Sequence, residues 1–316
     1  MITERIDAIT KIPPAYLRAD PPAPRSVKIE LTGRCNYRCG FCALRTRAAQ
    51  PKDDMDLALF KRITSDMHAN GVEEIGLFYL GESCTAPELL LQAVDWCKRV
   101  LGMPYVFLTT NGSLADPGLV RELMAKGLDS LKFSVNAADE EQFEKVMGVK
   151  AKLFHEAIAN LQGARAVRDA GGFKCGIYAS SIRYDGEQQE KMQAMLDRDV
   201  LPYVDQHYWL PLYSMGSLAT QREAELGYRP TAGNQGRLEA LREPLPCWSA
   251  FTEGHVTADG ILSACCFDAD QRWGMGDLND TPFMAAWHSA AFQSLRRAHL
   301  AKDVAGSVCE DCVAYR

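Results

Sequence analysis

The chain has 316 residues, of which 47% are hydrophobic and 24% charged, and its formal net charge is −6. This size allows one large α/β domain with a smaller appendage, and an acidic balance without a basic stripe argues against nucleic-acid binding. The sequence contains no run of about 18 apolar residues, so it predicts no membrane-spanning helix. Because residues 1–26 also lack the layout of a signal peptide, we expect a cytoplasmic protein with reduced thiols. Its eleven cysteines then indicate metal ligation in preference to disulfides.

Residues 1–25 are predicted to form an N-terminal arm, which is rich in proline over 11–25. From Ser26 onward, β-like runs alternate with amphipathic stretches of helical length. The expected strands are SVKIEL (26–31), EIGLFYL (74–80), YVFLTT (105–110), SLKFSV (130–135), KCGIYAS (174–180) and VDQHYWL (204–210). The expected helices lie around residues 56–69, 86–101, 116–127, 139–147, 153–170 and 186–198.

Six β–α alternations predict an α/β fold with a parallel sheet and crossover helices over residues 26–213, either a partial barrel or an open sheet. Functional loops in such folds lie at the carboxyl ends of the strands. The alternation stops in residues 214–246, where Gly, Pro and charged residues dominate, and we interpret this segment as a linker. Residues 247–316 are then expected to form a compact C-terminal module.

The segment ELTGRCNYRCGFCALR places Cys35, Cys39 and Cys42 in a CxxxCxxC pattern directly after the first expected strand. This spacing lets three thiolates of one loop reach three irons of a [4Fe–4S] cubane. The fourth iron then keeps an open position, which a small molecule with an amine and a carboxylate can chelate. A zinc loop without its fourth ligand is the alternative, and the absence of a nearby histidine in the sequence disfavours it.

With the aromatic Phe41 before its last cysteine, the CxxxCxxC motif resembles that of the radical S-adenosylmethionine (SAM) superfamily. The resemblance covers roughly residues 26–212 and implies a partial (β/α)6 barrel. It also implies reductive cleavage of SAM, hydrogen abstraction by a 5′-deoxyadenosyl radical, and a reducing protein partner such as flavodoxin or ferredoxin.

Further segments resemble the family's SAM-contacting elements at successive strand ends. Leu80-Gly81-Glu82-Ser83 stands where the family has Gly-Gly-Glu-Pro, so Leu80 and Ser83 depart from the pattern. Thr110-Asn111-Gly112 resembles the family's TNG turn, and the segment from Ser134 to Asn136 resembles its SLD segment. The SAM-binding residues that the resemblance implies are Phe41, Gly81, Glu82, Asn111, Ser134, Asn136 and Ser180.

A second cysteine group lies in the C-terminal module, at Cys247, Cys265, Cys309 and Cys312. It resembles the first half of the SPASM domain, and because the chain ends four residues after Cys312 we expect the shortened twitch form. The resemblance implies that these four thiolates fully ligate one auxiliary [4Fe–4S] cluster. Cys266 is the alternative to Cys265, although the spacing from Gly260 favours Cys265. A zinc ribbon is the other interpretation, but the first two cysteines are too far apart for a knuckle.

Four residues are candidates for catalysis. Cys84 is either a hydrogen-atom donor or nucleophile, or a small core residue. His207 and Tyr208 end the sixth expected strand, where a barrel opens towards substrate, and Arg183 lies near another strand end. A lone histidine is more often structural than catalytic. The polar AGNQGR loop, which contains Arg237, either caps the barrel mouth or is a solvated linker.

These features predict a radical SAM enzyme. Full ligation of the auxiliary cluster favours electron transfer, and hence two-electron oxidation of a small polar metabolite such as a sugar or cyclitol alcohol. The alternative is a peptide-modifying enzyme that forms a thioether, a carbon–carbon bond or an epimer. Only 25 residues precede the first expected strand, which favours the small-molecule substrate. A non-enzymatic Fe–S or zinc scaffold is the third interpretation.

Overall fold

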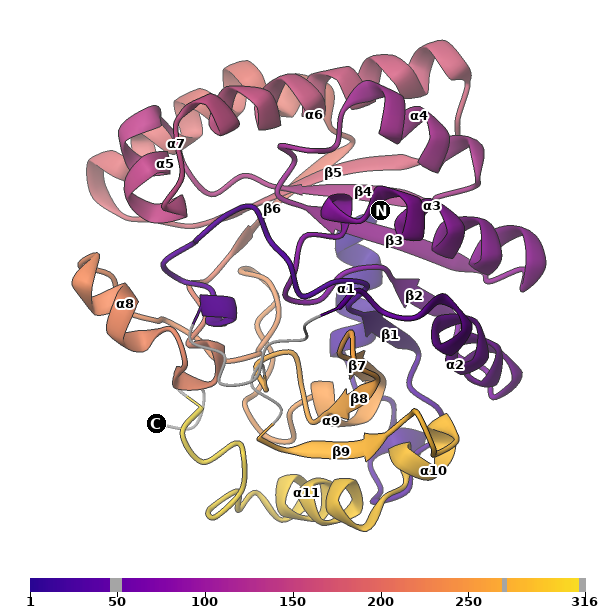
Figure 1. Ribbon diagram of the computed structural model, residues 1–316. Coiled ribbons are helices and arrows are strands. Elements are labelled where there is room, and N and C mark those ends of the chain that lie inside the picture. Colours follow the sequence, from indigo (N-terminus) through magenta and orange to yellow (C-terminus); the bar gives the residue numbers. More distant parts are fainter. Residues whose placement is uncertain (46–52, 269–271, 313–316) are drawn as a thin grey trace.

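The computed structural model describes residues 1–45, 53–268 and 272–312, and its centre is one open β-sheet (Figure 1). Its strands are β1 (Ser26–Ile29), β2 (Glu74–Gly76), β3 (Tyr105–Thr110), β4 (Ser130–Ser134), β5 (Gly176–Ile182), β6 (Gln206–Leu210), β7 (Glu253–Val256), β8 (Ile261–Ser263) and β9 (Gly274–Asp277). They lie in the order β6-β5-β4-β3-β2-β1-β7-β8-β9. Strands β1 to β7 pair in parallel, whereas β8 and β9 pair antiparallel.

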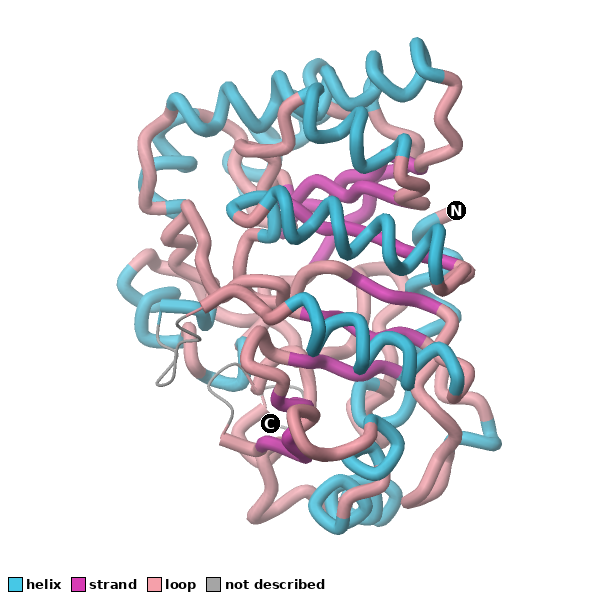
Figure 2. The backbone as a smooth tube through the Cα atoms, turned by 45° about the vertical axis from the view of Figure 1, so that its right-hand side comes forward, coloured by secondary structure: helices cyan, strands magenta, loops and turns pink. Residues whose placement is uncertain are grey.

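Helices cover the outer face of the sheet, as Figure 2 shows from a second direction. The α-helices are α1 (Ile2–Thr10), α2 (Leu57–Ala69), α3 (Pro87–Asp95), α4 (Pro117–Ala125), α5 (Glu140–Met147), α6 (Lys152–Gly171), α7 (Gly186–Asp199), α8 (Thr220–Glu225), α9 (Ser249–Thr252), α10 (Phe283–Trp287) and α11 (Ala290–Ala301). A π-helical turn, Trp96–Val100, continues α3. Short 3₁₀ turns lie at Pro14–Tyr16, Ala43–Arg45, Ser83–Thr85, Leu201–Tyr203 and Met215–Ser217. No helix in the described part of the chain is long and apolar enough to cross a membrane.

The α/β prediction for residues 26–213 is confirmed, with six parallel strands near their expected positions. Local signals explain where the helices begin. The Asp116 carboxylate caps α4 by accepting the backbone N–H groups of Gly118 and Leu119, and Pro117 takes the first helical position. The Asp139 carboxylate caps α5 in the same way.

Alternation along the strands separates the core from an inner face. In β1, Val27 and Ile29 are fully buried in the hydrophobic core, whereas Lys28 between them lines an internal cavity. In β4, Leu131 and Phe133 belong to the core and Lys132 lines the same cavity. In these two strands the lysines therefore face the cavity, whereas their apolar neighbours belong to the core.

The sheet also runs on into the C-terminal residues, because β7 pairs with β1 over Ser26↔Glu253 to Ile29↔Val256. The backbone N–H of Phe283, the first residue of α10, donates to the Asp66 carboxylate of α2 at 2.6 Å. Helix α10 is followed directly by α11, which Ser289 caps by accepting the backbone N–H of Phe292. Residues from 247 onward thus continue the sheet of residues 26–213.

Two segments differ from their expected form. Within the expected arm, α1 is a helix whose Ile2, Ile6 and Ile9 line the cavity. It is anchored by Asp7, whose carboxylate accepts from Arg237 at 2.8 and 3.0 Å. In the expected linker, residues 220–225 form α8. These elements are stabilised by tertiary contacts more than by local propensity, so the sequence pattern gave little sign of them.

Candidate radical site and its cavity

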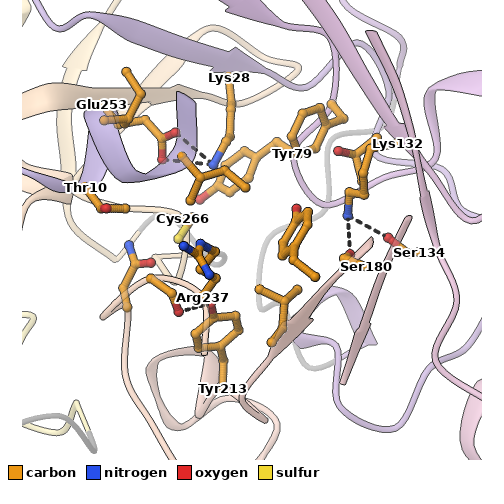
Figure 3. A pocket seen from close by; sticks show the side chains of 18 of the residues that line it. Thr10, Lys28, Tyr79, Lys132, Ser134, Ser180, Tyr213, Arg237, Glu253 and Cys266 are labelled. Atoms are coloured by element: carbon orange, nitrogen blue, oxygen red, sulfur yellow. Dashed lines mark hydrogen bonds and ion pairs between the residues drawn. The ribbon is translucent and has the colours of Figure 1, made fainter. Parts of the chain in front are cut away.

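The inner face of the sheet lines a cavity of ≈ 400 Å³, shown in Figure 3. Strands β1 to β6 and the loops that follow them contribute most of its wall, and α1 and residues of the C-terminal module contribute further parts. Residues from the segment expected as a linker also line it, among them Asn234 and Arg237. Of the two interpretations of that polar loop, the structure supports a wall of the cavity.

The CxxxCxxC loop lies at the carboxyl end of β1, and its Phe41 and Cys42 line the cavity. All three of its cysteines are half-buried. The Cys35 sulfur accepts the backbone N–H of Tyr37 at 3.4 Å, and the Cys39 sulfur lies 3.4 Å from that of Met147. The loop thus presents thiols beside a cavity large enough to hold a ligand.

Gly81 and Glu82 pack directly against this loop. The Glu82 backbone N–H donates to the Arg34 carbonyl at 2.8 Å, and a Cβ at Gly81 would lie 1.9 Å from the Thr32 carbonyl oxygen. Only glycine permits this approach, because any other residue would push the cysteine loop away. The close contact here is therefore between two backbones, and it does not depend on the side chain of Leu80.

The Glu82 carboxylate joins two strand ends. It accepts the Thr110 hydroxyl at 2.9 Å and the Asn111 backbone N–H at 2.7 Å. The Asn111 amide in turn donates to Asn36 of the cysteine loop at 2.9 Å. Burial raises the pKa of Glu82, although these hydrogen bonds oppose the shift. Gly81, Glu82 and Asn111 therefore hold the cysteine loop in place from outside the cavity.

Ser134, Asn136 and Ser180 reach the cavity, as expected from the strand ends on which they lie. Of the four catalytic candidates, Tyr208 also lines it, and burial raises the pKa of its phenol to about 12. The structure does not bring Cys84, Arg183 or His207 to the cavity wall. Cys84 is buried with its sulfur 3.7 Å from the Thr110 hydroxyl, as the core interpretation expects.

His207 lies on the other face of β6, because neighbouring residues of a strand point to opposite sides. Its Nε2 lies 3.0 Å from the Ser181 hydroxyl, and its ring contacts Trp209 edge-on. Burial lowers the pKa of His207 to about 4, so the ring is neutral near pH 7. His207 is therefore a packed, neutral histidine outside the cavity, which is the structural role that a lone histidine more often has.

Sequence reasoning missed a buried ion pair in the cavity. The Lys28 ammonium of β1 lies 2.9 Å from the Glu253 carboxylate of β7 (Figure 3). His255 lies 2.9 Å from the same carboxylate. Burial opposes the ionisation of Glu253, but the Lys28 charge and His255 hold its pKa at about 2. Residues 225 positions apart carry no local signal of such a pair, so no sequence pattern pointed to it.

Lys28→Met is expected to destabilise the fold by about 3–5 kcal/mol, because it leaves the Glu253 charge buried without its partner. Urea unfolding at pH 7 measures the loss. The double variant Lys28→Met/Glu253→Leu is expected to regain most of the stability, since an apolar pair needs no compensation. Equal losses in the single and double variants would contradict this role for the pair.

The pair also predicts acid sensitivity. The Glu253 carboxyl has a pKa of about 2 in the fold against an ordinary 4.5, so the stability it adds is complete above pH 4.5 and is lost as the pH falls towards 2.

The C-terminal cysteines line a second, smaller cavity of ≈ 30 Å³, to which Cys247, Cys265, Cys309 and Cys312 all contribute. Cys266 instead lines the large cavity. The two adjacent cysteines thus face opposite sides of the wall between the cavities. This placement supports Cys265 over Cys266 as the fourth member of the quartet.

His299 completes this second site, and it was not expected. Its Nε2 lies 3.3 Å from the Cys309 sulfur, and its Nδ1 accepts the Cys247 backbone N–H at 3.2 Å. Burial lowers the pKa of His299 to about 4. Burial, followed by the neighbouring Cys247 and Cys312 thiolates, raises the pKa of Cys309 well above its usual range.

Both cysteine groups fit iron–sulfur clusters. Among the residues described, no three His, Cys, Asp or Glu side chains are arranged to hold a single metal ion. A zinc ion draws its thiolates close together at about 2.3 Å from the metal, whereas a cubane takes one thiolate at each iron. Three cysteines on one loop would leave one iron of a cubane open, and the four around the second cavity would supply one thiolate to each iron of another.

A comparison with known families matches residues 29–193 to the radical SAM superfamily, a span of 165 of the 316 residues. The chain belongs to the radical SAM superfamily. Residues 247–313 match the SPASM iron–sulfur cluster-binding domain. As a radical SAM enzyme with a SPASM-type module, the protein uses SAM and a [4Fe–4S] cluster and carries an auxiliary iron–sulfur cluster. This membership removes the interpretation as a non-enzymatic scaffold.

Two curated relatives align over most of this radical SAM protein. The GTP 3′,8-cyclase of Synechococcus elongatus is 25% identical over 286 residues, covering 82% of this chain and 84% of the relative. The PqqA peptide cyclase of Xanthomonas campestris pv. campestris is 25% identical over 316 residues, covering 92% and 80%.

Solved structures share the fold. SuiB of Streptococcus suis, bound to its precursor peptide SuiA, superposes with a TM-score of 0.64 at 16% identity, covering 93% of this chain and 70% of SuiB. BtrN in complex with AdoMet and 2-DOIA superposes with a TM-score of 0.55 at 17% identity, covering 87% of this chain and 86% of BtrN.

Proposed function

We propose that this radical SAM enzyme modifies a peptide, by abstracting a hydrogen atom from one residue and joining that residue to another in the same chain. A relative that matches 92% of this sequence is a peptide cyclase, and SuiB, which has the same fold, was solved with a peptide bound. The similarity to a GTP cyclase raises nucleotide chemistry as the competing substrate class.

The charged residues that line the cavity favour a peptide over a nucleotide as the substrate. Four cations of the described residues line it, and three of them are paired: Arg5 with Glu74, Lys28 with Glu253, and Arg237 with Asp7. A nucleoside triphosphate needs several cations to compensate its phosphates. Among the described lining residues only Lys132 lacks an acidic partner, which suits at most one negative charge. A peptide side chain meets that condition.

Oxidation of a sugar or cyclitol, which the sequence analysis favoured, is the weaker proposal. Ile2, Ile6, Ile9 and several aromatic rings line the cavity. A polyhydroxylated ligand there would leave hydroxyls without partners, and each such loss costs binding energy. An apolar wall with a few polar groups suits an amino-acid side chain.

The residues divide into roles on this proposal. Cys35, Cys39 and Cys42 would hold the cluster whose open iron binds SAM, and that cluster would supply the electron for SAM cleavage. The residues that would contact SAM from the cavity side are Phe41, Ser134, Asn136 and Ser180. The cysteine loop is held in position by Gly81, Glu82 and Asn111. Tyr208 faces the space left for the substrate. A reduced flavodoxin or ferredoxin would deliver the electron.

The auxiliary site fits this chemistry as well. Joining two residues removes two hydrogens from the peptide, so one electron must leave the substrate radical. Cys247, Cys265, Cys309 and Cys312 would place an electron acceptor behind the wall that carries Cys266. The redox role expected for this site from the sequence is therefore retained, with a peptide in place of an alcohol.

Mass spectrometry of a library of short synthetic peptides tests the proposal. Each is incubated with the reconstituted, reduced enzyme and SAM. We expect one peptide to lose two hydrogens and to yield fragments that locate a cross-link, with one 5′-deoxyadenosine formed per cross-link. The Cys35→Ala variant controls for unrelated oxidation. Turnover of an alcohol or a nucleotide, with every peptide unchanged, would overturn it.

A further inference from the structure

Lys132 stands alone among the cavity cations. It lies in β4, is only 9% exposed, and its ammonium donates to the hydroxyls of Ser134 and Ser180 at 3.0 Å each (Figure 3). Ser134 and Ser180 are register partners on neighbouring strands, and Tyr208 is the partner of Ser180 on the next strand. Lys132 therefore lies two residues before the strand end at Ser134 that is proposed to contact SAM, on the same face of β4.

Its charge is not compensated within the described part of the chain. Two charged groups act on it from neighbouring elements: Lys28 repels it, and Glu82 attracts it weakly. The Glu82 carboxylate already accepts the Thr110 hydroxyl and two backbone N–H groups. The hydroxyls of Ser134 and Ser180 accept two of the three N–H donors of the ammonium, and neither hydroxyl carries a charge. One donor therefore remains for an anion.

Burial, followed by the Lys28 charge, lowers the pKa of Lys132 to about 7. A buried ammonium with no counter-charge is unfavourable, and an anion that enters the cavity would relieve this cost. The cavity is thus prepared for one anionic group at a defined position. A carboxylate suits it, because a single acceptor group with one charge matches a single ammonium.

We propose that Lys132 binds the carboxylate of an acidic side chain on the substrate and so selects the residue presented to the radical. This inference rests on the proposed function, since it names the side chain that a peptide substrate brings into the cavity. The ion pair between Lys28 and Glu253 does not compete for that side chain, because each member already has its partner.

The arrangement links binding to protonation. Lys132 is partly neutral near pH 7, and a bound carboxylate raises its pKa, so binding takes up a proton at and above pH 7. Affinity is then expected to fall as the pH rises above 7 and to level off below it. The carboxylate of SAM is the other possible source of the anion, and the experiment separates the two.

The test uses the reconstituted enzyme with an oxidised cluster, so that SAM binds without being cleaved. The probe is N-acetylglutamate methylamide, with its uncharged N-acetylglutamine analogue as control, and calorimetry measures binding to the SAM-loaded protein. We expect the wild type to prefer the acidic probe by about tenfold. Lys132→Met is expected to abolish that preference, and Lys132→Arg to retain it. Lys191→Met, an exposed lysine on α7, serves as the matched control.

Proton uptake by the wild type, measured in two buffers of different ionisation enthalpy, gives the same answer without any variant. No preference in the wild type, or a preference that survives in Lys132→Met, overturns the inference. Loss of SAM affinity in Lys132→Met with an unchanged preference assigns the cation to SAM and overturns it too. If the enzyme cross-links a peptide but does not prefer the acidic probe, the proposed function stands and the role of Lys132 falls. If it prefers the acidic probe but modifies no peptide, only the role of Lys132 stands.

Discussion

Cys35→Ala is expected to reduce cleavage of SAM to 5′-deoxyadenosine by more than about 100-fold, because it removes one of the three thiolates that would hold the first cluster. Loss of groups that merely support a metal ligand costs about 10–100-fold, and loss of a ligand itself costs more. Cys35 also packs against both hydrophobic clusters of the loop, one around Tyr37 and one around Leu80. Chromatographic quantification of 5′-deoxyadenosine after chemical reduction measures the effect.

Cys97→Ala is the matched control for that experiment. Cys97 is fully buried in the main core within the π-helical turn, away from both cavities, so its loss removes a thiol without touching either site. We expect this variant to keep full cleavage and the full iron content. Cleavage at the wild-type level in Cys35→Ala would show that the first cysteine loop does not hold the cluster that binds SAM.

The fold was predictable because its signals are local. Most strands from β1 to β6 are short runs that contain apolar or aromatic residues, and the helices α2, α4 and α5 each begin at a capping aspartate. Helix α1 illustrates the limit. Its nine residues hold three isoleucines at helical spacing, yet it is held in place by Glu74, Arg237 and the Ile9 carbonyl, which accepts the Thr252 hydroxyl. Contacts from such distant positions have no sequence period.

The same distinction between local and long-range signals applies to the site. Cys35, Cys39 and Cys42 lie on one loop, so their spacing alone indicated a shared cofactor. The role of His207 stayed open because a strand end offers two faces, and the sequence does not show which one meets the cavity. Lys132 and Lys28 were overlooked because a lysine in the middle of a predicted strand is usually solvent-exposed. Only the pairing of strands shows that these positions face an enclosed space.

A shared wall separates the C-terminal cysteine site from the large cavity. Tyr79 lies in that wall, with its hydroxyl donating to the Cys265 carbonyl at 3.0 Å while its ring lines the large cavity. Cys265 and Cys266 therefore connect the two sites through one peptide unit. A substrate radical in the large cavity would lie close to the group held by the quartet, which is the geometry that electron transfer requires.

Cys265→Ala and Cys266→Ala are expected to differ sharply, although the two residues are neighbours. Cys265 lines the quartet cavity, so its loss should lower the iron content from about eight to about four per chain. Product formation should fall by more than about tenfold while SAM cleavage persists, because the first loop is untouched. Cys266 faces the large cavity, so Cys266→Ala should keep about eight irons. Iron analysis and electron paramagnetic resonance of the reduced protein distinguish the variants, and the opposite pattern would assign the ligand to Cys266.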